Sequence, residues 1–144
     1  MSKQSSRIET TFATYTLGPV LGHGGAGRVL EATDEVGNVW AIKILDPARS
    51  TSDRRKRFKN EILFCQRTRH RNLVPIVDHG ISTLRGEATP FYVMPKYSGS
   101  LRTILKSLSD TMKRLRYFEY ILSGVEAAHL ANVIHRDITN QSVI

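Results

Sequence analysis

The chain has 144 residues, a formal net charge of +8, and 40% hydrophobic and 24% charged residues, which fits a soluble globular chain with one domain as the default. The single cysteine, Cys65, excludes an internal disulfide framework and is typical of a reducing compartment. Residues 1–7 lack the apolar segment of a signal peptide, and no apolar run approaches the length of a membrane span. We therefore expect a cytoplasmic protein.

The first third of the chain is predicted to be a β-meander after a loose polar tail at residues 1–13. Strands are expected at residues 15–20, 29–32 and 39–45, the last rich in β-branched and aromatic residues. A glycine-rich segment separates the first two strands. Turn-forming residues at 34–38 separate the second from the third.

A helix and two further strands are expected next. Residues 50–53 offer N-cap side chains for a helix that continues to about Arg67. Strands are expected at residues 73–77 and 91–94, with a turn at 84–87 between them.

The remaining elements are predicted to be helices, at residues 100–108 and 111–131. Asn132 is expected to close the second helix in the left-handed conformation. One face of that helix carries, at helical spacing, Leu115, Phe118, Leu122, Val125 and His129.

The positive charge has two explanations. It could indicate a polyanionic partner such as nucleic acid, or a basic part of a larger protein whose remainder is acidic. The basic residues at 54–59 lie on one predicted helix, where a solvated face is the usual explanation, and no interleaved aromatic residues offer stacking for bases. We therefore rank a nucleic-acid-binding domain low.

Three glycines, Gly22, Gly24 and Gly27, lie between the first two predicted strands. Glycine lets backbone N–H groups approach phosphate oxygens that a Cβ would exclude. In dinucleotide-binding folds the third glycine opens a helix, and an acidic residue about 20 positions later binds ribose. Here a strand follows and the residue near that distance is Lys43, which argues against a dinucleotide site. A hairpin turn without a ligand stays the alternative.

Lys43 ends the segment Trp40-Ala41-Ile42-Lys43 on the third predicted strand. A lysine in this place supplies a point charge for phosphates and needs a carboxylate to hold it. Glu61, on the following helix, is the natural partner. Either residue alone is more often a surface residue, so the order of glycine loop, strand lysine and helix glutamate carries the prediction.

The segment His135-Arg136-Asp137 follows the long helix. An aspartate here can accept the proton of a substrate hydroxyl and orient the attacking oxygen. His135 is expected to be a packing residue, and Arg136 a tether for a phosphorylated or acidic segment. As an isolated tripeptide, it would be read as an ordinary turn.

In this order and spacing the motifs resemble the eukaryotic-type protein kinase family, and most of all its bacterial serine/threonine branch. The matching segments are Gly22-x-Gly24-x-x-Gly27-x-Val29, Ala41-Ile42-Lys43, Glu61, His70-Arg71-Asn72 and His135-Arg136-Asp137. The resemblance covers about residues 15–144 and only the first half of the family's domain. It implies an α+β fold, with a kinase N-lobe and hinge at 14–97, built from a five-stranded antiparallel sheet plus one helix. The start of a truncated, mainly helical C-lobe would occupy 98–144.

The resemblance also implies ATP and Mg²⁺ as cofactors and a protein serine or threonine as substrate. Asp137 would be the catalytic base, and Lys43, paired with Glu61, would bind phosphate oxygens. Cys65 and His135 would be spine residues of the core. The implied nucleotide-binding residues are Leu21, Gly22, His23, Gly24, Gly25, Ala26, Gly27, Val29, Ala41, Lys43, the gatekeeper Met94, and the hinge residues Pro95 and Tyr97.

Three departures from the family pattern reduce the expected activity. Ser142 stands where the family has a magnesium-binding asparagine, and Thr139 where serine/threonine kinases usually have lysine. The sequence contains no D-F-G, activation loop or A-P-E. We expect this isolated chain to be weak or inactive as a kinase. The alternative is a non-catalytic kinase-like module that binds nucleotide or a partner. Because the apolar stripe of the helix at 111–131 would face water, we expect either marginal stability of the chain alone or another chain that covers this helix.

Overall fold

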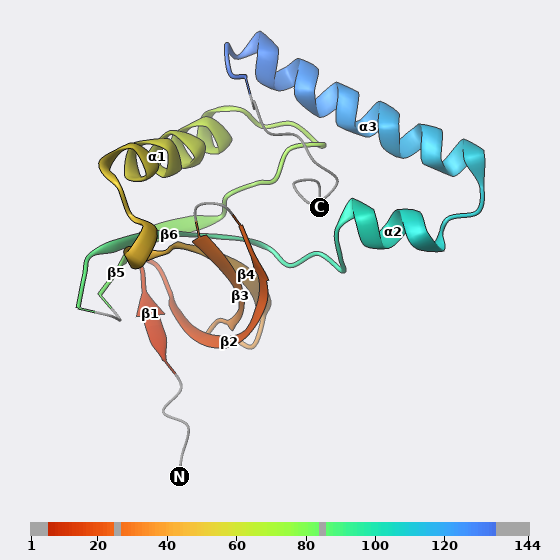
Figure 1. The fold of residues 1–144 in the computed structure, drawn as a ribbon. Helices are drawn as coiled ribbons and strands as arrows, with labels where there is room; N and C mark the ends of the chain where they lie inside the picture. The colour runs from red at the N-terminus through yellow and green to blue at the C-terminus, as the bar shows by residue number, and fades with distance from the viewer. Residues whose placement is uncertain (1–5, 25–26, 84–85, 135–144) are drawn as a thin grey trace. The chain divides into compact units, whose positions relative to one another are not determined.

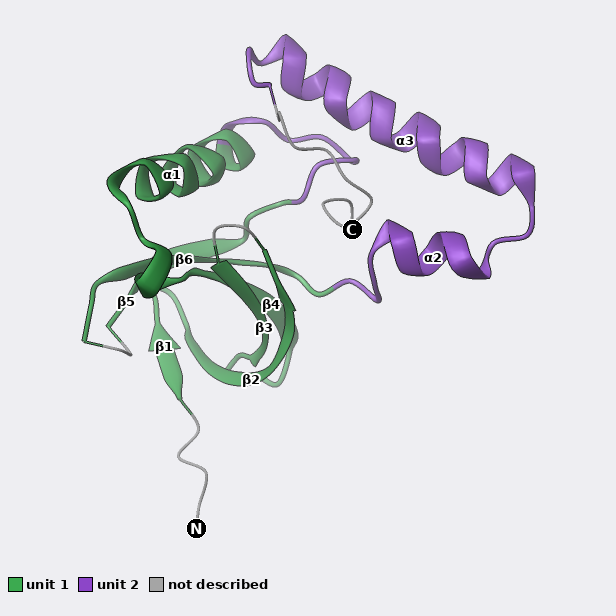
Figure 2. Cartoon of the chain, in the orientation of Figure 1, with its two compact units in different colours: residues 1–66, 75–96 green, residues 67–74, 97–144 purple. Residues whose placement is uncertain are grey.

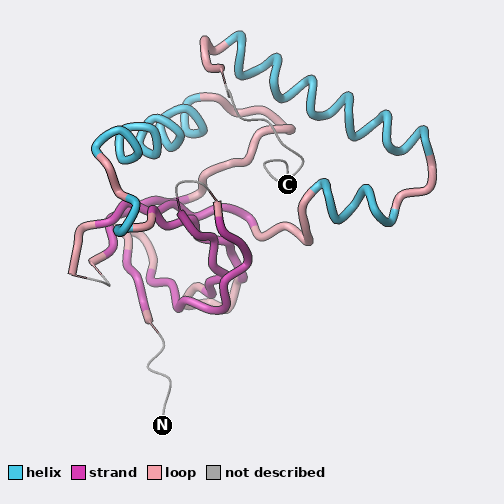
Figure 3. The backbone as a smooth tube through the Cα atoms, viewed as in Figure 1, coloured by secondary structure: helices cyan, strands magenta, loops and turns pink. Residues whose placement is uncertain are grey.

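The computed structural model describes residues 6–24, 27–83 and 86–134 (Figure 1). The chain divides into two compact units, the first of residues 1–66 and 75–96 and the second of residues 67–74 and 97–144 (Figure 2). Among the described residues, the first unit contains a β-sheet and one α-helix, and the second contains two α-helices (Figure 3). This confirms the predicted α+β class.

Six strands form one sheet in which every neighbouring pair is antiparallel, in the spatial order β1-β2-β3-β4-β6-β5. The strands are Arg7–Glu9 (β1), Thr14–His23 (β2), Gly27–Thr33 (β3), Val39–Leu45 (β4), Asp78–Ser82 (β5) and Thr89–Pro95 (β6).

The sheet has one strand more than the five predicted. The additional strand, β1, lies within the segment expected to be a polar tail. Its three residues pair with β2, and Ile8, opposite Tyr15, is the one that is buried, at 3% exposed. A single apolar residue between two charged ones gives too short a pattern to predict a strand.

The strand expected at residues 73–77 is also corrected, because the structure has β5 at Asp78–Ser82 instead. The apolar residues before β5 suggested a strand, but only Val77 joins the sheet, where its N–H donates to the carbonyl of Val93 at 2.9 Å. The strand itself is polar and has low β propensity at Asp78 and Gly80.

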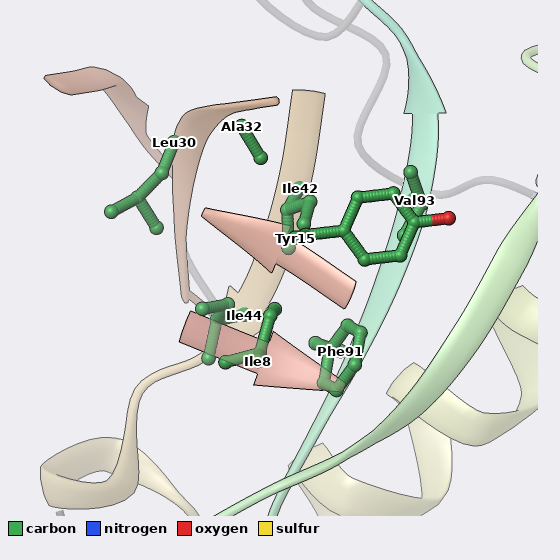
Figure 4. Close-up of a cluster of buried hydrophobic side chains, with 8 residues drawn as sticks. All are labelled: Ile8, Tyr15, Leu30, Ala32, Ile42, Ile44, Phe91 and Val93. Carbon is green, nitrogen blue, oxygen red and sulfur yellow. The ribbon is translucent and has the colours of Figure 1, made fainter. Parts of the chain in front are cut away.

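Buried side chains from β1, β2, β3, β4 and β6 form the core on one face of the sheet (Figure 4): Ile8, Tyr15, Leu30, Ala32, Ile42, Ile44, Phe91 and Val93. Because side chains alternate along a strand, the residues between them belong to the opposite face. On that face Ala41, Tyr92 and Met94 are also buried. The central strands are therefore covered on both faces.

Helix α1, Ser52–Arg67, follows a short 3-10 turn at Pro47–Arg49. The Thr51 hydroxyl accepts a hydrogen bond from the Arg54 N–H at 3.3 Å and so caps the helix N-terminus. Phe58 and Ile62 are its buried residues, one turn apart on the face toward the sheet. That spacing places Glu61 beside them on the same side of the helix.

The second unit contains helices α2, Leu101–Ser107, and α3, Thr111–Leu130. Asp110 caps α3 by accepting a hydrogen bond from the Met112 N–H at 2.8 Å. Asn132 follows the helix with a φ of 59°, so the predicted left-handed closure is confirmed.

Residues 67–74 pack on one side of α3. A Cβ on Gly124 would lie 2.7 Å from the Asn72 carbonyl oxygen, so only glycine permits this approach. The Arg71 guanidinium lies 5.6 Å from the centre of the Tyr120 ring. Leu115, Phe118 and Leu122 of the predicted apolar stripe are 50%, 56% and 51% exposed.

Within the described part of the chain, no helix is long and apolar enough to span a bilayer.

Candidate nucleotide site

The glycines between β2 and β3 have different surroundings. A Cβ on Gly27 would overlap the Ile44 carbonyl oxygen, so packing alone requires glycine there. A Cβ on Gly22 would meet nothing within 4 Å, and one on Gly24 only the Gly27 carbonyl oxygen at 3.8 Å. Glycine at positions 22 and 24 is therefore not explained by packing, and its smallness leaves room for a ligand to approach the backbone.

The strand pairing around these glycines is irregular. The register between β2 and β3 shifts on both sides of Val20, then Gly22 pairs with Val29 and His23 with Arg28. The Gly24 N–H donates to the Gly27 carbonyl at 2.8 Å, and this hydrogen bond joins the two sides of the turn. The predicted binding residues Gly25 and Ala26 lie outside the described residues.

Lys43 on β4 and Glu61 on α1 form an ion pair with both carboxylate oxygens engaged. Lys43 Nζ donates to Glu61 Oε1 at 2.9 Å and to Oε2 at 3.1 Å. The two side chains are 22% and 39% exposed, so the pair is partly shielded yet reachable from solvent. The structure thus forms the pair expected from the sequence. Since the ammonium has three N–H donors, one remains for another acceptor.

Two aromatic rings flank this ion pair. Lys43 Nζ lies 5.5 Å from the centre of the Tyr92 ring and 5.8 Å from that of Phe58. The Tyr92 hydroxyl donates to Glu61 Oε1 at 2.8 Å. Burial, followed by the negative charge of Glu61, raises the pKa of Tyr92 well above its ordinary value, so the phenol keeps its proton.

Tyr92 was not among the site residues predicted from the sequence. The signal that could have found it is strand register: Tyr92 lies opposite Lys43 in the β4–β6 pairing, and it precedes the predicted gatekeeper Met94 by two residues. Both therefore share the face of the sheet that carries Lys43. Its partner Glu61, on a separate helix, could not be read from that spacing.

Predicted adenine-binding residues share this face of the sheet. Val29 lies opposite Lys43, and Ala41 lies opposite Met94. Ala41 and Met94 are 3% and 4% exposed. Beside them, Glu31 accepts a hydrogen bond from Lys96 Nζ at 2.6 Å. This face of the sheet therefore has an apolar surface next to the Lys43 ammonium.

The other predicted site residues are distributed as follows. Leu21 is 45% exposed on β2, and Tyr97, 40% exposed, belongs to the second unit. The predicted catalytic Asp137, the metal ligand Ser142 and the spine residue His135 lie outside the described residues.

The described residues fit a phosphate-bearing nucleotide but offer no metal site. They contain no group of three or more His, Cys, Asp or Glu side chains that could hold a metal ion. The donor proposed from the sequence is the Ser142 hydroxyl, a weaker ligand for a hard cation than the amide oxygen that the family uses.

Cys65 lies one helical turn after Glu61. Burial, and then the Glu61 carboxylate, raise the pKa of its thiol to about 11. A thiol that stays protonated at neutral pH is a poor nucleophile, which agrees with a packing role.

Comparison with known proteins places this arrangement in a family. A family model described as "protein kinase domain" matches residues 15–144. The chain belongs to the protein kinase domain family.

Curated relatives from bacteria and from a yeast, among others, are named as protein kinases. A probable serine/threonine-protein kinase of Streptomyces coelicolor is 35% identical over 136 residues, covering 90% of this chain and 20% of the relative. Serine/threonine-protein kinase PknH of Mycobacterium tuberculosis is 31% identical over 147 residues, with 98% and 23% covered. Mitogen-activated protein kinase HOG1 of Debaryomyces hansenii is 34% identical over 141 residues, with 95% and 35% covered. The chain spans about a fifth to a third of these relatives.

Proposed function

We propose that this chain binds ATP as part of a protein serine/threonine kinase, a transferase. The observation that carries the proposal is the Lys43–Glu61 ion pair, whose lysine lies on the same sheet as the open glycine turn. The adenine would lie against Val29, Ala41 and Met94, and its edge would bind the backbone of Pro95 and Tyr97. The γ-phosphate would transfer to a serine or threonine hydroxyl of a protein substrate.

Lys43 would act as the cation for the phosphates. Two of its N–H donors are directed at Glu61, and the remaining one can bind a phosphate oxygen without breaking the ion pair. The carboxylate keeps the ammonium in place, so little reorganisation is needed when ATP binds. Glycine at positions 22 and 24 lets the turn backbone approach the same phosphates.

Asp137 would accept the proton of the substrate hydroxyl as its oxygen bonds to the γ-phosphorus and the bond to ADP breaks. A magnesium ion arriving with ATP would neutralise part of the phosphate charge. Because Ser142 stands at a magnesium-ligand position and Thr139 replaces a lysine, we propose a low transfer rate for this chain. The same two residues favour the second candidate, a kinase-like module that binds nucleotide without transferring phosphate.

A thermal-shift measurement with the 144-residue chain tests ATP binding. ATP should raise the unfolding temperature, because a ligand that binds only the folded state stabilises it. Lys43→Met should weaken the ATP affinity by about tenfold or more, since a hydrogen bond to a charged group contributes about 1.5–3 kcal/mol. The matched control is Lys59→Met, which removes an exposed lysine of α1 and should leave the shift unchanged. Equal shifts in both variants would refute the proposed site.

Transfer of labelled phosphate from ATP to a generic protein substrate separates the two candidates. We expect a rate near background for the unmodified chain. Clear incorporation that Asp137→Ala abolishes would overturn the low-rate proposal and leave the ATP site intact.

A further inference from the structure

Tyr92 is a buried residue whose hydroxyl is committed to Glu61. The side chain lies on β6 and is 5% exposed. Its hydroxyl donates at 2.8 Å to Oε1, the same oxygen that accepts from Lys43 Nζ at 2.9 Å. Hydrogen bonds to a carboxylate are shorter and stronger than neutral ones. The carboxylate is therefore held from two strands, β4 through Lys43 and β6 through Tyr92.

Packing supports this hydrogen bond. The Tyr92 ring lies 5.3 Å, centre to centre, from the ring of Phe58, which is 1% exposed and precedes Glu61 by three residues on α1. Phe58 thus fixes the helix against β6, and the hydroxyl fixes the carboxylate one turn further along. The ring limits the positions open to the Tyr92 hydroxyl, so the hydrogen bond costs little further side-chain entropy.

We infer that Tyr92 is a positioning residue for the ATP phosphates: its hydroxyl holds Glu61, and Glu61 in turn holds the Lys43 ammonium. This inference rests on the proposed ATP site. While the third N–H of Lys43 binds a phosphate, Glu61 keeps its hydrogen bonds from both Lys43 and Tyr92. Without the Tyr92 hydroxyl, Glu61 Oε1 would lose one of its two donors, and the less firmly held carboxylate would position the Lys43 ammonium less well for the phosphates.

The alternative role for the Tyr92 hydroxyl is purely structural: it would satisfy a buried polar group and stabilise the fold without positioning Lys43. The two roles differ in their effect on ligands. If Tyr92 has a positioning role, loss of its hydroxyl should weaken the binding of ligands that carry phosphates. It should not weaken the binding of adenosine, which has no phosphate to contact Lys43. A purely structural role affects both ligands equally or neither.

The first experiment measures amide hydrogen exchange of α1 in the nucleotide-free chain. Tyr92→Phe keeps the ring and removes only the hydroxyl, so we expect exchange over residues 52–67 to rise by about tenfold, as the loss of a hydrogen bond to a charged group implies. The matched control is Tyr15→Phe, which removes a hydroxyl that donates to Asp78 in the same sheet. It should leave exchange of α1 unchanged. In a Glu61→Ala background, Tyr92→Phe should add nothing.

The second experiment compares ATP and adenosine affinities of the same variants by calorimetry. Tyr92→Phe should lower ATP affinity by about fivefold to tenfold and leave adenosine affinity within about twofold. Equal losses for both ligands, or an unchanged ATP affinity, would overturn the positioning role. If the unmodified chain binds no ATP, the proposed function falls. In that case the amide hydrogen exchange of α1 in Tyr92→Phe still tests whether Tyr92 holds Glu61, because this measurement needs no nucleotide.

Discussion

Asp34 organises the turn between β3 and β4 through its carboxylate. Oδ1 accepts from the N–H groups of Val36 at 3.1 Å and Asn38 at 2.8 Å. Oδ2 accepts from the Asn38 amide and from the Trp40 indole, both at 2.9 Å. The Trp40 hydrogen bond is the largest cause that lowers the pKa of Asp34, from 3.8 to about 2. All of these donors favour the charged carboxylate.

Stability should therefore depend on pH through Asp34. Since its folded-state pKa lies below the ordinary value, its contribution is complete above pH 3.8 and is lost as the pH falls toward 2. Urea unfolding of the parent chain and of Asp34→Asn should show a stability difference that narrows from about pH 5 to about pH 2.5. Glu35→Gln, an exposed neighbour, is the control and should show no such trend. A difference that stays constant across this range would contradict the assignment.

The two glycines at the ends of the turn between β2 and β3 should respond differently to alanine. Gly27→Ala forces a Cβ into the Ile44 carbonyl, and we expect a loss of about 1–3 kcal/mol or more in unfolding free energy. Gly22→Ala meets open space and should change unfolding by less than about 0.5 kcal/mol. It should nevertheless weaken ATP binding, measured by calorimetry. Weaker folding but unchanged ATP affinity in Gly22→Ala would argue against a phosphate role for this glycine.

At the scale of elements, β1 and β5 at the two ends of the sheet contact each other. Asp78 at the start of β5 makes the link, because its Oδ2 lies 2.6 Å from the Thr10 hydroxyl and 3.0 Å from that of Tyr15. Burial, and then Asp78, raise the pKa of Tyr15 above its ordinary value, so Tyr15 remains a donor. The N-terminal segment is thereby tied to a strand more than sixty residues later.

Asp78→Ala should loosen this link and leave the buried Tyr15 hydroxyl without its acceptor. We expect a loss of about 1–3 kcal/mol in unfolding free energy by denaturant titration, the cost of an unsatisfied buried polar group. His79→Ala, at the next and exposed position of β5, should cost much less. Equal losses in the two variants would mean that Asp78 does not link the strands.

The elements that were predicted correctly have a long hydrophobic pattern or clear capping residues in the sequence. The strands that were missed lack such a pattern. Helix α1 and the left-handed Asn132 follow from local capping and periodicity. By contrast, β1 has one buried apolar residue, and β5 is polar, so their strand state depends on partners far along the chain. The site shows the same limit. The Lys43–Glu61 pair was predicted because a phosphate-binding lysine needs a carboxylate partner and Glu61 lies on the following helix. The hydrogen bond from Tyr92 to Glu61 depends on how α1 packs against β6, which the sequence pattern does not show.

At the scale of the whole molecule, α3 presents an apolar face that the described residues leave exposed. Leu115, Phe118 and Leu122 share this face, opposite the side that packs on residues 70–72. Contiguous apolar surface of this kind marks a site for association. We propose that another chain covers it, and in a solution of the purified protein that chain is a second copy.

Replacing Leu115 and Leu122 together by glutamine should then reduce self-association or aggregation, measured by sedimentation velocity. The thermal unfolding midpoint should change little, because both side chains are already about half exposed. The control pair Arg116→Gln and Glu119→Gln alters exposed polar positions of the same helix and should leave association unchanged. A parent chain that sediments only as a monomer would contradict the proposal.

Covalent labelling with an acyl-phosphate derivative of ATP tests the nucleotide site most directly. A lysine amine near the bound phosphates attacks the acyl carbon, forms an amide and releases the nucleotide, and mass spectrometry of the digested chain identifies the lysine. We expect Lys43 to carry the label and excess ATP to prevent its labelling, while exposed Lys56 and Lys59 are labelled weakly and without protection. Labelling spread over the exposed lysines, with Lys43 unmodified or unprotected by ATP, would contradict the proposed nucleotide site.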